Sequence, residues 1–138
     1  MPAKDIYHNS AKNALIKDGW TITDDPLTLR LGKKEMYVDL GAKKLLAAEK
    51  ANKKIAIEVK SFIGPSEIKD LRDALGQYVL YHDVLERTEP ERRLYLAITK
   101  AVFFDLFDEP IGQILIENQR VKLIVFDPKT EEIIKWIP

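Results

Sequence analysis

The stretch Lys54-Ile55-Ala56-Ile57-Glu58-Val59-Lys60-Ser61-Phe62 decides how this chain folds. Its β-branched residues alternate at a period of two, without Gly or Pro, which predicts a strand. Such an apolar run is typical of a central strand that is covered on both faces. Glu58 and Lys60 would then lie on one face, roughly 6.5 to 7 Å apart along the strand. An ion pair removed from water seldom adds net stability, so these two charges mark a candidate site.

The length and charge of the chain limit the classes of protein to consider. With 138 residues, we expect a single domain over residues 1–138. Lys plus Arg and Asp plus Glu both number 22, so bulk charge does not hold the chain to nucleic acid. The absence of cysteine excludes disulfides and thiolate metal sites. We expect a cytoplasmic protein, because no apolar signal core and no run long enough to span a membrane is found.

Upstream of the central strand, the sequence predicts one helix and several extended runs. The helix covers residues 3–18 and is stopped by Gly19. The extended runs are Trp20–Thr23, Leu27–Leu31 and Met36–Leu40, whereas Lys44–Glu49 is either a strand or a helical turn. A hairpin loop joins that last segment to the central strand. His8 and Lys12 lie on one face of the first helix. They are either solvated edge residues or the rim of a site, with Lys12 positioned for a phosphate.

The best helix in the sequence follows the central strand. It covers about Ser66 to Leu85, with Ser66 as its N-cap. Its predicted core stripe is Ile68, Leu71, Leu75, Tyr78, Val79 and Leu85, and an adjacent line contains Asp70, Ala74, Gln77 and Tyr81. Gly76 costs about 1 kcal/mol relative to Ala in a helix, which favours close backbone packing there.

The C-terminal part predicts a strand, two short helices and a hairpin. These elements are Arg93–Ile98, residues 100–107 and 110–118, and the strand pair Val121–Phe126 and Ile133–Ile137. The whole order is therefore mixed α/β.

Asp39 gives the charged pair of the central strand an acidic partner. Its simplest role is a turn at a strand end before Gly41, because Asp disfavours strand interiors. Beside Glu58, however, two carboxylates and the carbonyl of Val59 could hold Mg²⁺. The metal would polarise a phosphate and activate a bound water. Lys60 could orient or deprotonate that water, or offset charge on the phosphorane.

Further residues complete this hypothesis of a DNA-cleaving site. Gln77 and Tyr81, one helical turn apart, could contact the DNA backbone or the attacking water. Glu49 is the substitute acid if Asp39 is misplaced, since it too ends a strand that faces the central one. The alternative is a satisfied ion pair within the sheet, because short motifs of this kind also occur by chance.

The same residues resemble a known catalytic pattern. Asp39 followed by Glu58-Val59-Lys60 resembles the PD-(D/E)xK motif of the restriction-endonuclease-like superfamily, although Val38 stands where many members carry Pro. Gln77-x-x-x-Tyr81 resembles the accessory motif of its RecB-type and resolvase-like branches. This resemblance implies a core of helix, mixed central sheet, long helix and strand, here with a C-terminal helical and hairpin appendage. The Glu that some members carry in the first helix is absent.

A second resemblance covers essentially the whole chain. The sequence is similar to the XisH family, the fdxN-element excision controlling factors of cyanobacteria. The segments that carry this similarity are Pro2–Asp5, Tyr7–Asn9, Lys17–Trp20, Ala74–Tyr78 and Lys135–Pro138. The resemblance implies programmed excision of a DNA element, together with a site-specific recombinase and a second small factor, XisI. The family name describes a requirement for excision and does not specify a reaction.

Two kinds of function remain open at this point. An intact Asp/Glu/Lys set favours a Mg²⁺-dependent DNA endonuclease or nickase. Zero net charge favours a non-catalytic factor that binds DNA or XisI and directs the recombinase, since a domain without net positive charge binds DNA weakly at physiological salt. A protein-interaction module would instead expose a large apolar patch. The two-fold symmetry of DNA favours a homodimer, which no residue specifies.

Overall fold

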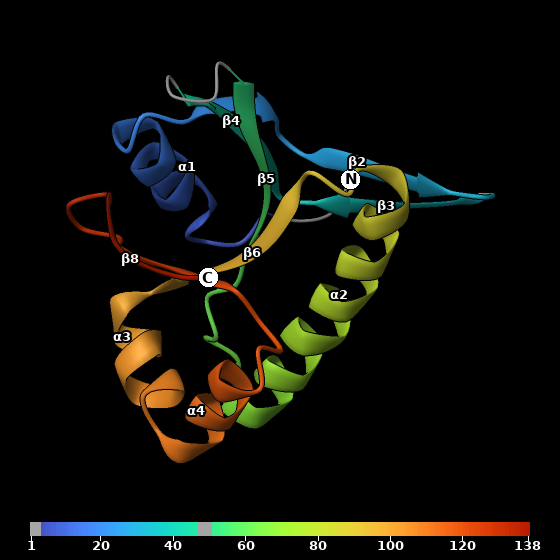
Figure 1. Ribbon diagram of the computed structural model, residues 1–138. Helices are drawn as coiled ribbons and strands as arrows, with labels where there is room; N and C mark the ends of the chain where they lie inside the picture. The colour runs from blue at the N-terminus through green and yellow to red at the C-terminus, as the bar shows by residue number, and fades with distance from the viewer. Residues whose placement is uncertain (1–3, 47–50) are drawn as a thin grey trace.

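The computed structural model describes residues 4–46 and 51–138, and Figure 1 shows its arrangement. A twisted sheet carries α1 on one face and α2, α3 and α4 on the other. In chain order the elements are α1 (His8–Lys17), β1 (Thr21–Asp24), β2 (Leu27–Leu31), β3 (Lys34–Val38), β4 (Leu40–Leu46), β5 (Ala51–Val59), α2 (Glu67–Thr88), β6 (Arg93–Thr99), α3 (Lys100–Val102), the π-helical turn η1 (Phe103–Phe107), α4 (Pro110–Glu117), β7 (Leu123–Asp127) and β8 (Glu132–Ile137). The predicted mixed α/β class is confirmed.

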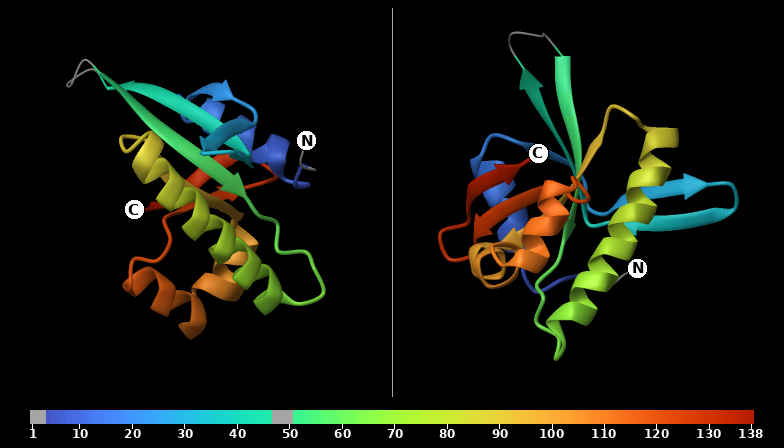
Figure 2. Two further views of the ribbon diagram at one scale, coloured as in Figure 1. Left: turned by 90° about the vertical axis from the view of Figure 1, so that its right-hand side faces the viewer. Right: turned by 60° about the horizontal axis from the view of Figure 1, so that its bottom comes forward.

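The main sheet is built around β5, as the alternating stretch predicts. Within the described residues its strand order is β1-β4-β5-β6-β7-β8. β5 pairs antiparallel with β4 and parallel with β6. The C-terminal hairpin continues this sheet, because β7 pairs parallel with β6 and antiparallel with β8. β2 and β3 form a separate hairpin, which Figure 2 shows beside α2.

The two faces of β5 belong to two different hydrophobic cores. Ile55, Ile57 and Val59 pack in the core beneath α1. Ala56 packs in the core beneath α2, and Glu58 points to that same face because side chains alternate along a strand. The central, doubly covered strand therefore places a carboxylate under the long helix.

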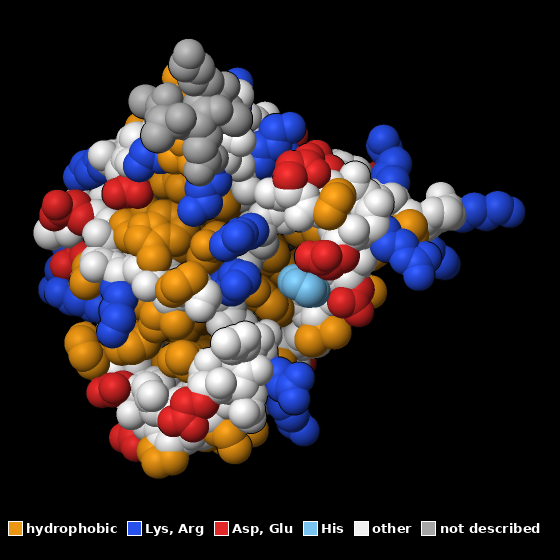
Figure 3. All heavy atoms as spheres, viewed as in Figure 1, with side chains coloured by type: hydrophobic (Ala, Val, Ile, Leu, Met, Phe, Trp, Pro, Cys, Tyr) orange, Lys and Arg blue, Asp and Glu red, His pale blue; other side chains and the backbone are white. Residues whose placement is uncertain are grey.

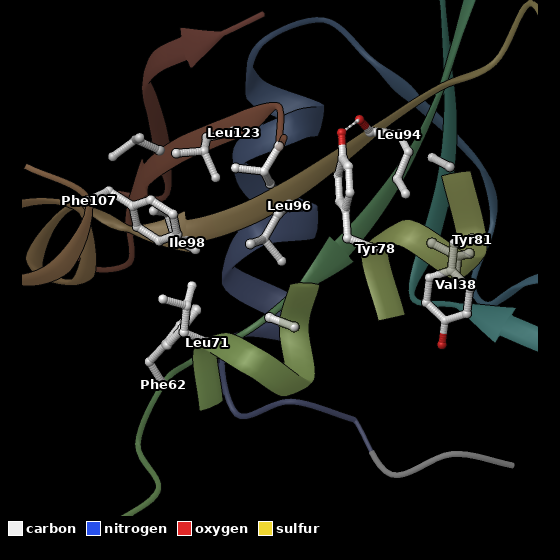
Figure 4. Packing of buried hydrophobic residues seen from close by; sticks show 14 of the residues in the cluster. Val38, Phe62, Leu71, Tyr78, Tyr81, Leu94, Leu96, Ile98, Phe107 and Leu123 are labelled. Atoms are coloured by element: carbon white, nitrogen blue, oxygen red, sulfur yellow. Dashed lines mark hydrogen bonds between the residues drawn. The ribbon is translucent and has the colours of Figure 1, made fainter. Parts of the chain in front are cut away.

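The long helix α2 begins as predicted, but its buried face differs from the predicted stripe. Ser66 is the N-cap, and its Oγ accepts a hydrogen bond from the Lys69 N–H at 3.2 Å. The buried residues of the helix are Leu71, Ala74, Tyr78, Tyr81, Val84 and Leu85. Figure 4 shows Leu71, Tyr78 and Tyr81 among these packed side chains, with the Tyr78 hydroxyl donating to the Leu94 carbonyl at 3.0 Å.

Three predictions about α2 are therefore wrong. The side chains of Ile68 and Val79 are 46% and 56% exposed, because the buried face is rotated toward Ala74 and Tyr81. Gly76 is exposed, and a Cβ there would meet nothing within 4 Å in the described part of the chain. Its presence is not explained by packing within the fold.

The boundaries of other helices and strands also differ from those predicted from the sequence. The first helix begins at His8, later than predicted, because residues 6 and 7 form a turn. Gly19 ends it with φ +95°, a left-handed conformation that favours glycine. Lys44–Leu46 belongs to β4, so the strand alternative is confirmed there. Residues 47–50, including Glu49, lie outside the described residues. Among the described helices, none is both long and apolar enough to cross a membrane.

Candidate functional site

Asp39 and Glu58 lie side by side because of the register between β4 and β5. Leu40 opens β4 opposite Ile57, which places the preceding residue, Asp39, next to Glu58. Each carboxylate accepts a backbone hydrogen bond from the other segment. Oδ2 of Asp39 accepts from the Val59 N–H at 2.7 Å, and Oε1 of Glu58 accepts from the Asp39 N–H at 3.2 Å. The two acids are thus fixed by the backbone of two paired segments.

Burial makes this pair of carboxylates electrostatically costly. Burial and the neighbouring charge of Asp39 raise the pKa of Glu58 to about 8, while Lys60 acts in the opposite direction. Burial also raises the pKa of Asp39 above its ordinary value. Two adjacent carboxylates that are partly removed from water favour one shared proton or a bound cation, because either reduces the repulsion between like charges. The site is therefore suited to a positive ion.

A cavity of about 210 Å³ opens at these two carboxylates. Lys60, Gln77 and Tyr81 line it with them, so the structure brings these sequence-predicted residues together. Its full lining is Lys4, Asp5, Tyr37, Asp39, Glu58, Val59, Lys60, Gln77 and Tyr81. Burial and the charges of Glu58 and Asp39 raise the pKa of the Tyr81 phenol to about 12. Tyr81 is therefore a hydrogen-bond donor at neutral pH.

Three residues of the lining were not predicted from the sequence as part of the site: Lys4, Asp5 and Tyr37. Asp5 ties the N-terminal segment to the site, because its carboxylate accepts from the N–H groups of Tyr7 and Ser61, both at 2.9 Å. An acidic residue just before a helix is a recognisable signal for a local turn. Its contact with Ser61 spans 56 residues of sequence and has no local signature.

His8 and Lys12 are held elsewhere and do not line this cavity. Nε2 of His8 lies 2.8 Å from Oδ1 of Asp25, and Nζ of Lys12 donates to Oδ2 of Asp25 at 2.7 Å. His8 is only 3% exposed, so the solvated-edge interpretation is wrong for it. Both side chains fasten α1 to the loop between β1 and β2. Their predicted role in substrate binding stays a prediction.

The donor atoms at Asp39 and Glu58 fit Mg²⁺ if backbone and water complete the shell. Among the described residues, no group of three or more His, Asp or Glu side chains is placed to hold a metal. The two carboxylates would therefore need the Val59 carbonyl and several waters. Mg²⁺ commonly binds through one or two carboxylates and keeps several waters. Glu49, the substitute acid, lies outside the described residues.

Comparisons with known proteins extend over nearly the whole chain. The XisH protein family model matches residues 1–134. An XisH family protein from Nostoc punctiforme PCC 73102 shares 38% identity over 97% of this chain and 100% of that chain, with a TM-score of 0.87. An fdxN element excision controlling factor protein from Anabaena variabilis shares 40% identity over 98% of this chain and 100% of that chain, with a TM-score of 0.86. No curated protein matches. The chain therefore belongs to the XisH family, which the sequence resemblance predicted.

Proposed function

We propose that the cavity at Asp39 and Glu58 is a Mg²⁺-dependent site that cleaves or nicks DNA during excision of a DNA element. The observation that carries this proposal is the buried carboxylate of Glu58 beside the half-buried carboxylate of Asp39, each bound to a backbone amide of the other segment, with the pKa of Glu58 raised to about 8. A purely structural ion pair between Glu58 and Lys60 has little use for a second carboxylate beside it. The setting is supported by the relative from Anabaena variabilis, which is named as an excision controlling factor.

The cavity residues that the sequence predicted would have separate tasks. Asp39, Glu58 and the Val59 carbonyl would hold Mg²⁺, which supplies Lewis-acid polarisation of the phosphate and a more acidic bound water. Lys60 would orient the attacking water or offset negative charge that develops on the phosphate. Gln77 is exposed at the cavity and would hydrogen bond to the DNA backbone or to the water. Tyr81, protonated at neutral pH, would donate a hydrogen bond.

A second function is favoured by the charge of the chain. Lys plus Arg and Asp plus Glu both number 22, so the protein has no bulk attraction for DNA. A non-catalytic factor would bind DNA or an XisI-type protein and direct a site-specific recombinase, either as a monomer or as a homodimer. In that case excision would not require a metal ion bound at Asp39 and Glu58.

Nicking of supercoiled and branched DNA separates these two functions. The protein is incubated with Mg²⁺ or Mn²⁺, with and without an XisI-type partner. Glu58→Gln keeps the shape of the side chain but removes its charge, and Lys60→Gln removes the ammonium charge and leaves a polar side chain. We expect nicking in the wild type, and its loss in both variants.

Matched controls keep the comparison specific. Lys54→Gln changes a lysine on the same face of β5 as Lys60, and Glu132→Gln changes an exposed acid on β8. Both should keep full nicking activity. Normal excision in cells that carry Glu58→Gln would contradict the catalytic proposal and leave the directing factor.

A further inference from the structure

A second cavity, of about 260 Å³, lies on the α1 face of the sheet, toward the opposite end of β5 from Glu58. It is lined by Asp18, Trp20, Lys44, Leu46, Lys53 and Trp136, and is called here the tryptophan–lysine cavity. Both tryptophans of the chain border it. Figure 3 shows hydrophobic surface meeting Lys and Arg side chains on this side of the molecule, between β8 and the ends of β4 and β5. None of these residues belongs to the carboxylate cavity.

The aromatic wall of this cavity is rigidly placed. The ring centroids of Trp20 and Trp136 are 5.8 Å apart at an angle of 38°. Trp136 also meets Tyr95 edge-on, with centroids 5.0 Å apart. Trp20 and Tyr95 are buried, whereas Trp136 is only half-buried and belongs to the edge strand β8. An indole held from behind with part of its surface open is a stacking platform for a planar ring.

The cationic wall consists of two lysines that face each other. Lys44 and Lys53 are direct partners in the β4–β5 register. Like charges placed directly across a ladder destabilise the sheet. The Nζ of Lys44 donates to the Asp18 carbonyl at 2.7 Å and lies 5.6 Å from the Trp20 ring centroid, which holds that ammonium beside the indoles.

The lining also contains one acid, Asp18. Its carboxylate accepts from the Trp20 indole N–H at 3.1 Å and lies 3.8 Å from the Nζ of Lys44. Asp18 therefore orients Trp20 and offsets part of the charge of Lys44. An anion between Lys44 and Lys53 would relieve the remaining repulsion between the two ammonium groups.

We propose that the tryptophan–lysine cavity binds one nucleotide of a single DNA strand, with its base against Trp136 and its phosphate at Lys44 and Lys53. Aromatic surface beside basic groups is the combination that holds single strands without reading their sequence. In a duplex the base would be stacked and paired, so the indole could not reach its face. The proposal goes beyond the cleavage site, because it requires neither Mg²⁺ nor Glu58.

Intrinsic fluorescence reports directly on this cavity, since both tryptophans line it. The full chain is titrated with an oligothymidylate, with thymidine monophosphate and with a duplex, in chelator and at low salt. We expect saturable quenching by the oligothymidylate at much lower concentration than by the mononucleotide, and little quenching by the duplex. Quenching should persist in Glu58→Gln, so that a failure of the cleavage proposal and a failure of this one are told apart.

Two neighbouring lysines provide a matched pair of variants. Lys53 and Lys54 are adjacent and both half-buried, but they point to opposite faces of β5. With a labelled oligothymidylate, Lys53→Gln should weaken binding about fivefold and reduce the slope of log affinity against log salt by about 0.7. Lys54→Gln should leave the affinity within about twofold of wild type, since its ammonium lies on the other face of the sheet and acts on the strand only through screened solvent.

Trp136→Leu tests the stacking half of the proposal. It should weaken binding of the labelled strand about tenfold or more, because stacking of a base on an aromatic ring carries that much affinity. Melting curves of each variant establish that it is folded. The proposal is overturned if no saturable quenching occurs, if the duplex quenches as well as the single strand, or if Lys53→Gln and Lys54→Gln weaken binding equally.

Discussion

The two ends of β5 carry charges of different kinds in different surroundings. At its C-terminal end Glu58 is buried beside Asp39, where their carboxylates accept backbone hydrogen bonds. At its N-terminal end Lys53 and Lys54 are half-buried and face Lys44 and Lys43. Ile55, Ala56 and Ile57 between them are fully buried. The number of charges does not distinguish the two ends, but their burial does. The contribution of the carboxylate end to stability should depend on pH and on divalent cations, and that of the lysine end on salt concentration.

The largest effect expected from this contrast is a change in the free energy of unfolding with pH, caused by the titration of Glu58. Its pKa is raised by burial from 4.5 to about 8 in the folded state. Between these pH values the folded chain holds a proton that the unfolded chain has lost. The free energy of unfolding should therefore fall as pH rises through this window, by at most about 1.4 kcal/mol per pH unit. Urea midpoints measured in chelator across the window would show the decline.

The matching variant is Glu58→Gln, which cannot lose a proton. It should remove most of this pH dependence and be more stable than the wild type near pH 8, although we expect it to lose nicking activity. Lys53→Gln should leave the pH dependence in place. Parallel curves for wild type and Glu58→Gln would show that the buried carboxylate is not the source.

An intermediate effect is expected at Gln77, which lines the carboxylate cavity but is exposed. Gln77→Ala should slow nicking about tenfold, the equivalent of one hydrogen bond of about 1.4 kcal/mol in the transition state. Its urea midpoint should stay close to wild type, because the side chain is exposed. Leu71→Ala on the same helix should behave in the opposite way and cost about 2–5 kcal/mol of stability. A Gln77→Ala variant that nicks at the wild-type rate would remove this residue from the site.

The smallest effect is expected at the lysine end. Lys54→Glu turns the like-charge pair with Lys43 into an opposite-charge pair. It should stabilise the fold by about 0.2–1 kcal/mol at low salt. High salt should abolish the gain, because Lys43 is exposed and Lys54 only half-buried, so that ions screen the pair. Urea midpoints at two salt concentrations measure it, and a gain that survives high salt would mean that packing rather than charge is responsible.

The local sequence pattern was sufficient to predict β5 and the face of Glu58. It favoured a turn at Asp39, and the place of Asp39 beside Glu58 was a hypothesis that the resemblance to the PD-(D/E)xK motif supported, because the pairing depends on the register between β4 and β5. The face of α2 was harder, because apolar residues such as Ile68 and Val79 also occupy its exposed side. Helical periodicity then allows more than one buried stripe, and contacts with the sheet select among them.

The remaining features depend on contacts between distant segments. The pairing of His8 and Lys12 with Asp25, and the contact of Asp5 with Ser61, join parts of the chain that no local pattern connects. The same holds for the parallel pairing of β7 with β6, which makes the C-terminal hairpin part of the main sheet. Such contacts follow from the topology, and a single sequence does not reveal the topology.

Binding of Mg²⁺ at Asp39 and Glu58 is the central claim, and the melting temperature of the full chain tests it most directly. A cation and a proton compete for Glu58, so the effect of the metal must depend on pH. Melting is followed with and without Mg²⁺, near pH 8 and near pH 5, in the wild type and in Glu58→Gln. We predict that Mg²⁺ raises the melting temperature of the wild type near pH 8, but not near pH 5 and not in the variant. An equal rise in both proteins, or no rise in either at any pH, would contradict the account.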